Sequence, residues 1–294
     1  MSFGDRDSLL ATARTTEALG YSELYTADHV GNADPLLPLM IAAEATTHLR
    51  LGPLVINNEL NHPALLARTI ATADHMTGGR VILGMGTGYM QSEHDATGIE
   101  LRTPRDRVDR LEESLIVLRS LLDRGAVSHE GVHHRIELAD LGVRPDQDRV
   151  PILVGGHGRR VIDVGAKHAD VFQFTGLTFG PDGAPDTGGF GLDSIRERCR
   201  WLTEAAGDRS DEIVRSALVQ RVAVGGGADD QIHALIDDRG FDRRLIDETP
   251  FILMGSEEQV IDKVERLRAE LAVSHFVVRK PEVFAPIVER LGQA

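Results

Sequence analysis

The sequence is poor in cysteine, in basic residues and in long apolar runs. Cys199 is the single cysteine, which excludes a disulfide framework and a thiolate metal cluster and is typical of a reducing compartment. Residues 1–10 lack the apolar region of a signal peptide, and no apolar run reaches the ~20 residues that a membrane span needs. We therefore expect a cytoplasmic protein with no membrane partner.

Lysine and arginine together number 32, against 46 acidic residues, for a formal net charge of -14. This balance argues against a general nucleic-acid or membrane-surface binder. We expect a small molecule as the partner. His133 and His134 are adjacent, but no acidic or cysteine ligand stands at a recognisable spacing from them, so we predict no metal site.

Predicted strands and helices alternate through the 294 residues, a normal length for one α/β barrel. We predict seven strands, around Glu23, Leu51, Val81, Ile152, Val171, Val219 and Phe276. Eight would close a (β/α)8 TIM barrel, but only Ser2 and Phe3 are available for a strand before the first helix. We expect one domain, residues 1–294, whose first strand is short or missing. A doubly wound open sheet is disfavoured by the number of units and the lack of an early G-x-G-x-x-G turn.

Some segments depart from this alternation. Residues 126–140 are predicted to form a small inserted hairpin, and residues 175–191 a long mobile loop. Within residues 225–249, the segment from Ile232 to Ile236 has a helical pattern, whereas the segment from Phe241 to Asp247 is predicted to be irregular. The longest amphipathic helix covers residues 105–122. We expect its polar face to be solvated; that face carries Arg107, Asp109, Arg110, Glu112 and Glu113.

A glycine-rich turn follows the predicted strand at Ile152. Such a turn lets backbone N–H groups approach a ligand, and the helix that begins after it offers unpaired N–H groups that suit a phosphate. Arginines in the first helical turn oppose the helix dipole unless an anion is present. The predicted anion site comprises Gly155, Gly156, His157, Gly158 and Arg159, with Arg160 beside it. A tight turn without a ligand is the alternative.

Several short motifs, in this order along the chain, resemble the bacterial luciferase-like monooxygenase superfamily. They are Asp28-His29 at a strand end, residues 52–57 followed by 62–68, residues 78–80 before 83–88, and Val154-Gly155-Gly156. The resemblance extends from Asp5 to Arg279 and is nearest to the branch that uses the deazaflavin coenzyme F-420. No single motif is specific, but their combination is.

The resemblance implies a luciferase-like (β/α)8 barrel that binds a flavin or deazaflavin at the carboxyl ends of its strands. A bulge, often with a non-proline cis peptide bond, would support the ring around Leu54, Val55 and Ile56. Asp28 would meet the polar edge of the ring, and His29 would lie over its reactive face. The other implied cofactor-binding residues are Asn57, Gly86, Thr87, Gly88, Gly155, Gly156, His157, Gly158, Arg159 and Thr175.

The implied activity is hydride transfer between F-420 and a small organic substrate. His29 suits proton transfer because an imidazole titrates near neutral pH. Glu93 and its neighbour His94 are alternative acid or base groups, and Tyr89 is a proton donor or part of the pocket lining. Members that oxidise sugar phosphates carry glutamate where Tyr89 stands, so we do not expect a sugar-phosphate substrate.

Other functions remain open at this point. FMN is the alternative cofactor, in a monooxygenase that uses reduced FMN and molecular oxygen. A non-catalytic barrel that binds a cofactor or a partner is the alternative from a different class. By analogy with the fold, we also expect a homodimer.

Overall fold

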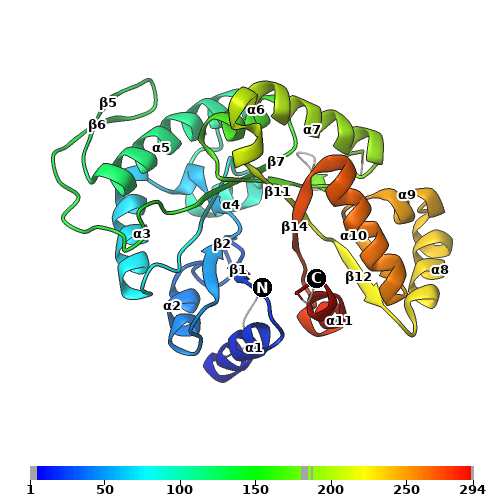
Figure 1. Ribbon diagram of the computed structural model, residues 1–294. Coiled ribbons are helices and arrows are strands. Elements are labelled where there is room, and N and C mark those ends of the chain that lie inside the picture. Colours follow the sequence, from blue (N-terminus) through cyan, green and yellow to red (C-terminus); the bar gives the residue numbers. More distant parts are fainter. Residues whose placement is uncertain (1–4, 180–184, 187, 293–294) are drawn as a thin grey trace. The chain divides into compact units, whose positions relative to one another are not determined.

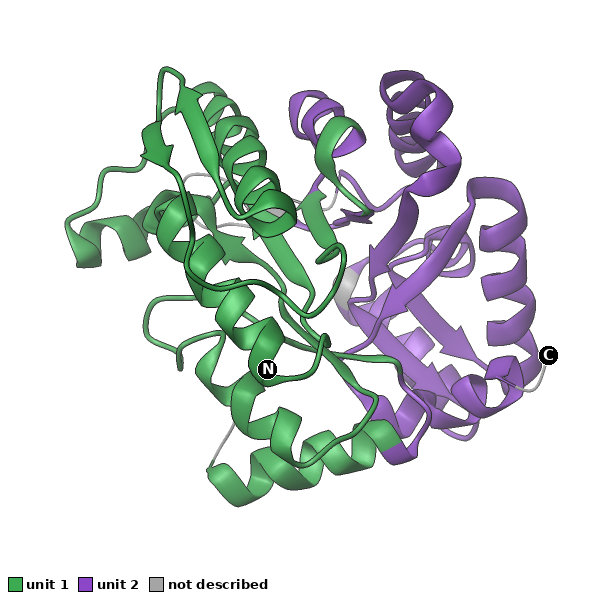
Figure 2. Ribbon diagram, turned by 60° about the vertical axis from the view of Figure 1, so that its left-hand side comes forward, with its two compact units in different colours: residues 1–17, 22–155, 167–170 green, residues 18–21, 156–166, 171–294 purple. Residues whose placement is uncertain are grey.

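The computed structural model describes residues 5–179, 185–186 and 188–292. The expected first strand at Ser2 and Phe3 therefore lies outside the described residues. The chain divides into two compact units, coloured separately in Figure 2. The first comprises Met1–Glu17, Ser22–Gly155 and Lys167–Asp170, and the second comprises Ala18–Tyr21, Gly156–Ala166 and Val171–Ala294.

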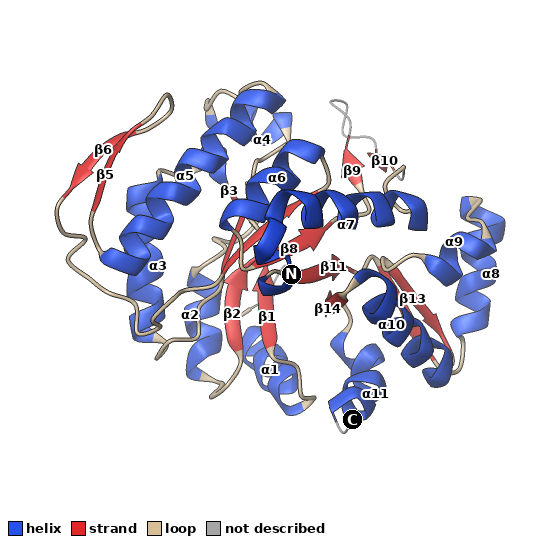
Figure 3. Cartoon of the chain, turned by 45° about the horizontal axis from the view of Figure 1, so that its top comes forward, coloured by secondary structure: helices blue, strands red, loops and turns tan. Residues whose placement is uncertain are grey.

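Strands and helices alternate in the first unit, as the sequence predicts (Figure 3). Its elements are α1 (Arg6–Ala18), β1 (Glu23–Thr26), α2 (Leu37–Glu44), β2 (Arg50–Pro53), β3 (Ile56–Asn57), the 3-10 helix η1 (Asn58–Leu60), α3 (Pro63–Met76), β4 (Leu83–Gly86), α4 (Gln91–Thr97), α5 (Pro104–Arg124), β5 (Val127–Glu130), β6 (Arg135–Leu138) and β7 (Ile152–Gly156). Strand β1 pairs parallel with β2, and β4 lies between β3 and β7, parallel to both. Each strand thus ends on the same side as its neighbour.

The strand expected over residues 49–56 is divided into β2 and β3. β2 pairs with β1, whereas β3 pairs with β4. Between them, the Leu54-Val55 peptide bond is cis, as the family resemblance implies. The Leu54 N–H is still bonded to the Thr26 carbonyl at 2.6 Å. The chain therefore changes its pairing partner across this bulge.

Apolar side chains of α1, α2 and the first two strands form one core cluster of the first unit. Its buried members are Leu9, Ala13, Leu24, Leu39, Ala42, Ala43, Leu49 and Leu51. The spacing of Leu9 and Ala13 is that of one helix face, which is why α1 packs as predicted. This core fixes β1, and with it the position of the residues that follow β1.

The second unit repeats the alternation. Its elements are α6 (Arg159–His168), β8 (Val171–Phe174), β9 (Thr178–Phe179), β10 (Pro185–Asp186), α7 (Leu192–Ala206), the 3-10 helix η2 (Gly207–Glu212), β11 (Val214–Leu218), β12 (Arg221–Val224), α8 (Ala228–Arg239), α9 (Arg243–Glu248), β13 (Ile252–Gly255), α10 (Glu257–Leu271), β14 (Val273–Val277) and α11 (Pro281–Gly292). β11 lies between β8 and β14, and β12 pairs with β13, all parallel. One core cluster comprises Val219, Val222, Leu253, Val260, Val264, Phe284 and Ile287.

Three expectations for the second unit need correction. The single strand predicted over residues 217–224 is two strands, because Val219 N bonds to Val277 O while Gln220 N bonds to Phe251 O. The helical pattern from Ile232 to Ile236 is confirmed as part of α8, but the segment from Phe241 to Asp247 is not irregular, because it contains most of α9, with Asp242 as the N-cap. The loop predicted over residues 175–191 includes the antiparallel pair β9 and β10; residues 180–184 and 187 of it lie outside the described residues.

The inserted hairpin predicted near residues 126–140 is confirmed as β5 and β6, beside α5 in Figure 1. The Glu113 carboxylate of α5 accepts the backbone N–H groups of Val132, His133 and His134 at 2.8 to 2.9 Å. Burial raises the pKa of Glu113, but these donors outweigh burial and leave it below its usual value. No helix among the described residues is long and apolar enough to cross a membrane.

Candidate active site

Asp28 and His29 lie just beyond β1, separated from it by Ala27, at the edge where the parallel strands of the first unit end. The Asp28 carboxylate accepts the backbone N–H of Asn57, which ends β3, at 2.9 Å. Burial raises the pKa of Asp28, and the charge of Glu93 adds to this, while the Asn57 N–H opposes it. Asp28 therefore ties the end of β1 to the end of β3.

His29 and Glu93 form an ion-pair contact. Nδ1 of His29 lies 2.7 Å from Oε1 of Glu93, whose side chain is only 6% exposed, against 36% for His29. Because an ionised carboxylate only accepts, the Nδ1 atom carries the proton in this contact. None of the residues that the structure describes hydrogen-bonds Nε2 of His29. The imidazole is thus held on one side and open on the other.

Tyr89 completes this group. Its ring meets that of His29 edge to face, with centroids 6.3 Å apart and an interplanar angle of 86°. The side chain is 43% exposed. The three residues predicted as catalytic, His29, Tyr89 and Glu93, are therefore neighbours, and Asp28 precedes one of them in the chain.

The bulge after β2 is packed against glycines of the next strands. A Cβ at Gly86 would lie 2.5 Å from Val55 Cγ2, and one at Gly84 would lie 2.1 Å from the Pro53 carbonyl oxygen. Gly155 also faces Val55, at 3.6 Å from its ideal Cβ position. The motif glycines Gly84 and Gly86 thus make room for the bulge.

Gly88 is required to be glycine both by its backbone conformation and by its close approach to Asn57. Its φ is +71°, and a Cβ there would lie 2.2 Å from Oδ1 of Asn57. Thr87, between Gly86 and Gly88, is half-buried, and its hydroxyl lies 3.4 Å from the Gly88 carbonyl. The loop that follows β4 therefore lies directly against the end of β3.

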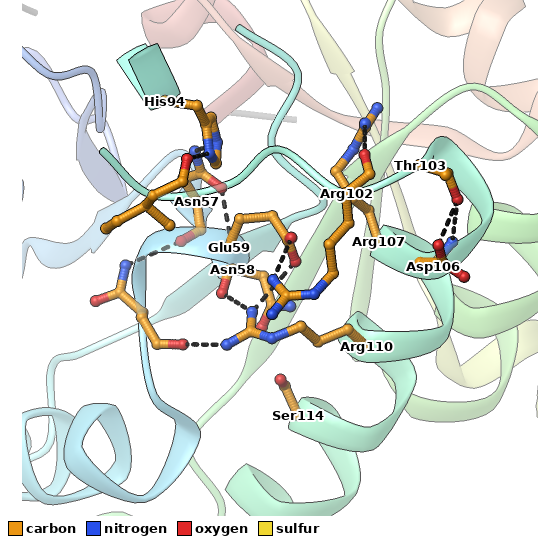
Figure 4. A network of polar contacts seen from close by, with 12 residues as sticks. Asn57, Asn58, Glu59, His94, Arg102, Thr103, Asp106, Arg107, Arg110 and Ser114 are labelled. Atoms are coloured by element: carbon orange, nitrogen blue, oxygen red, sulfur yellow. Dashed lines mark hydrogen bonds and ion pairs between the residues drawn. The ribbon is translucent and has the colours of Figure 1, made fainter. Parts of the chain in front are cut away.

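Asn57 is held at both ends of its side chain (Figure 4). Its Oδ1 accepts the Glu59 N–H at 3.0 Å, and its Nδ2 lies 3.4 Å from Nε2 of His94. Nδ1 of His94 lies 3.0 Å from the carbonyl oxygen of Ile99. His94 is 1% exposed and lies, with Glu93, on α4, a short helix that the sequence analysis did not predict.

The 3-10 helix η1, which follows β3, carries Glu59, the centre of a network of ion pairs. The Glu59 carboxylate is fully buried and pairs with Arg102 at 2.9 Å and with Arg110 at 3.2 Å. Arg110 also donates to the carbonyls of Asn58 and Asn61. Figure 4 shows both guanidinium groups converging on Glu59. The prediction that Arg110 lies on a solvated helix face is therefore wrong.

The other predicted cofactor residues belong to the second unit. A Cβ at Gly156 would meet Val161 at 2.5 Å, whereas the Cβ position of Gly158 is open. The Arg159 guanidinium contacts Asp163 at 2.9 Å and Glu204 at 3.6 Å, and it lies 5.7 Å from the Trp201 ring centroid. An anion at the start of α6 would compete with these carboxylates for Arg159.

His157 and Thr175 are the remaining members of that set. His157 is exposed in the turn before α6. Thr175 follows β8, and its carbonyl accepts from Arg198 at 3.0 Å. Their predicted contact with a cofactor stays a prediction.

Solved structures define the fold of the chain. The structure of coenzyme F-420 dependent tetrahydromethanopterin reductase from Methanopyrus kandleri matches with a TM-score of 0.75 and 21% identity, and covers 99% of this chain and 94% of that chain. The chain accordingly has the luciferase-like TIM-barrel fold. The luciferase-like monooxygenase family model matches residues 4–200, and the chain belongs to this family.

Relatives in the family have different activities. The F-420-dependent glucose-6-phosphate dehydrogenase of Microbacterium testaceum (strain StLB037) is 31% identical over 53% of this chain and 48% of its own length. The 4-hydroxyprotoasukamycin monooxygenase of Streptomyces nodosus subsp. asukaensis is 30% identical over 78% of this chain and 61% of its own length. The chain spans about half the length of the curated relatives it matches.

Proposed function

We propose that this chain is an oxidoreductase that transfers a hydride between coenzyme F-420 and a small organic substrate. The observation that carries the proposal is the His29–Glu93 contact of 2.7 Å, next to Asp28, which accepts the backbone N–H of Asn57. F-420-dependent enzymes among the relatives support the same activity.

The chemistry of the residues at the strand ends fits the polar edge of a deazaflavin. Asp28, which is held by the backbone N–H of Asn57, offers a carboxylate acceptor, and the loop from Gly86 to Gly88 presents backbone without side chains at its two ends. The bulge residues Leu54, Val55 and Ile56 would support the ring, with Thr87 and Gly155 beside it. In the second unit Gly156, His157, Gly158, Arg159 and Thr175 would hold the phosphate side.

When bound, the deazaflavin supplies or accepts the hydride. The chain contributes the proton: His29 would give or take it at Nε2, the nitrogen that faces away from Glu93. The buried Glu93 carboxylate would stabilise the imidazolium and keep the ring in one orientation. Tyr89 would line the pocket at the edge of the imidazole or act as a further proton donor.

A flavin monooxygenase is the second candidate. It is supported by the relative from Streptomyces nodosus, which is matched over more of this chain than the dehydrogenase. Both activities need a tricyclic ring on the same bulge, so the geometry of Asp28 and His29 serves either one.

A fluorescence titration of the purified protein with oxidised F-420 and, separately, with FMN tests the proposal. We expect tighter binding of F-420, followed by substrate-dependent oxidation of its reduced form. Tighter FMN binding together with oxygen consumption would replace the proposal with the monooxygenase. Binding of neither cofactor would leave a partner-binding barrel.

We further propose that residues 1–294 form one domain, cytoplasmic and homodimeric. The fold match over 99% of the chain supports one domain, and the single cysteine supports a reducing compartment. Gel filtration with light scattering at micromolar concentration should give twice the chain mass of 32.1 kDa. A mass of one chain would reject the dimer.

A further inference from the structure

We propose that His94 is a positioning residue for the cofactor seat, by which we mean the strand ends at Asp28 and Asn57. It acts through Asn57 and Asp28, and it acts separately from the Glu93–His29 pair. The inference rests on the proposed function, because the seat is the one that would receive the ring. The side chain of His94 contacts Asn57 and Ile99, both residues of the first unit.

The two consecutive residues of α4 serve different strand ends. Adjacent side chains on a helix point about 100° apart, so neighbours in sequence reach different partners. Glu93 contacts His29, which follows β1, whereas His94 contacts Asn57, which ends β3. One short helix therefore holds both predicted parts of the site, the proton-transfer group and the ring support.

The hydrogen bonds around His94 allow one arrangement of protons. The Glu59 N–H can only donate, so the atom of Asn57 that faces it is Oδ1, and Nδ2 faces His94. Nε2 of His94 must then accept. The proton of the neutral ring is on Nδ1, where the Ile99 carbonyl accepts it at 3.0 Å. Each hydrogen bond in the series that links Ile99, His94, Asn57 and Glu59 therefore has one donor and one acceptor.

Asn57 passes this constraint to the seat. Its backbone N–H donates to Asp28 at 2.9 Å, and its carbonyl accepts from Asn61 Nδ2, also at 2.9 Å. His94 thus fixes the side chain of a residue whose backbone fixes Asp28. Loss of the acceptor at Nε2 would leave Asn57 Nδ2 without a partner in a buried position.

Two substitutions distinguish the roles of the two ring nitrogens of His94. His94→Asn keeps a donor near the Nδ1 position and removes the acceptor at Nε2. His94→Gln places an amide oxygen near the Nε2 position and keeps the acceptor for Asn57. Glu93→Gln on the same helix is the matched control, because it alters the other strand end.

Hydrogen–deuterium exchange of residues 54–61, measured without cofactor, is the first readout. We expect exchange about five- to tenfold faster in His94→Asn, and near wild type in His94→Gln and Glu93→Gln. Titration with oxidised F-420 is the second readout, and we expect Kd to rise by a similar factor in His94→Asn but not in His94→Gln.

Unchanged exchange in His94→Asn, or equal effects in His94→Asn and His94→Gln, would overturn the positioning role. The positioning role would also be overturned if the wild-type protein binds F-420 and His94→Asn binds it with the same Kd despite faster exchange. A wild-type protein that binds neither F-420 nor FMN, with faster exchange in His94→Asn, would overturn the proposed function and support the action of His94 on Asn57.

Discussion

The side chain of Val55 occupies the space into which any side chain at Gly86 would grow: an ideal Cβ on Gly86 would lie 2.5 Å from Val55 Cγ2. The two residues belong to neighbouring strand ends, and Ile56, next to Val55, pairs with Met85, next to Gly86. The glycine is therefore required by the bulge on the adjacent strand, whether or not a cofactor is bound.

Gly86→Ala should lower the free energy of unfolding by about 1–3 kcal/mol, because an added methyl group in packed surroundings forces a shift. Val55→Ala in the same chain removes the clashing methyl groups, so the double variant should recover most of that loss. Urea unfolding measures both. Gly84→Ala is the matched control: its Cβ would meet the Pro53 carbonyl at 2.1 Å, so Val55→Ala should not rescue it.

His29→Ala should reduce turnover about 100-fold or more while leaving F-420 binding close to wild type, because it removes the proton-transfer group. Oxidation of reduced F-420 across a panel of carbonyls, imines and alcohols measures the rate, and fluorescence titration measures binding. Tyr89→Phe keeps the ring that meets His29 and removes the hydroxyl, and it should retain more activity. Undiminished turnover in a cofactor-bound His29→Ala protein would exclude His29 as the acid or base.

Glu93→Gln should lower kcat by about tenfold or more, since the charge-assisted hydrogen bond that His29 donates to a buried carboxylate is replaced by a neutral one. KM for the substrate should change little, because Glu93 acts through His29. Steady-state kinetics over a range of pH separates the two parameters. A variant with raised KM and unchanged kcat would assign Glu93 to substrate binding instead.

Removing Arg110, a partner of the buried Glu59 carboxylate, should lower the free energy of unfolding. Arg110→Met leaves the fully buried Glu59 carboxylate with Arg102 alone, and we expect a loss of about 3–5 kcal/mol in the free energy of unfolding. Glu59→Gln with Arg110→Met should lose less, because the buried carboxylate that Arg110 contacts is also removed. A loss in the double variant equal to the sum of the losses in Arg110→Met and Glu59→Gln alone would mean that the two residues do not interact.

His134 should make stability depend on pH below neutrality. Burial, with the positive charge of Arg110 and the neighbouring His62, lowers the pKa of His134 to about 4. Its imidazole contacts Ser114 Oγ at 2.9 Å. Between pH 6.5 and 4 the unfolded chain takes up a proton at this histidine and the folded chain does not, so stability falls as the pH is lowered.

The expected loss over that interval is about 3 kcal/mol. Urea unfolding at pH 7 and pH 4.5 measures it. His134→Gln should show a smaller difference between the two pH values, whereas His133→Gln, at the adjacent position, should behave as wild type. The same pH dependence in both variants would assign the effect to other groups.

Much of the site could be predicted from the family resemblance. The residues Asp28 and His29 after a strand, the glycines after Leu83 and the order of the motifs carry that resemblance, which implies the cis bulge. The contact between His29 and Glu93 could not, because 64 residues separate them and no spacing rule links them. Only the folded arrangement of β1 and α4 brings the pair together.

Two misinterpretations have clear physical causes. Residues 91–97 have no apolar periodicity, so α4 gave no helix signal, although Glu93 and His94 are buried in pairs with polar partners. Arg110 was assigned to solvent because charge normally indicates exposure, but Glu59 on η1 neutralises it inside. A hydrophobic pattern does not indicate buried polar pairs, since each member alone resembles a surface residue.

The hairpin tip offers a convenient point for chemical labelling. Val132 is 90% exposed, while its backbone N–H is anchored by Glu113, so a new side chain there would project from a fixed backbone. The sole thiol, Cys199, is buried, and burial raises its pKa, which makes it a poor nucleophile for maleimides. Val132→Cys would therefore create a single addressable thiol for a spectroscopic probe or surface attachment, with no need to remove the native cysteine.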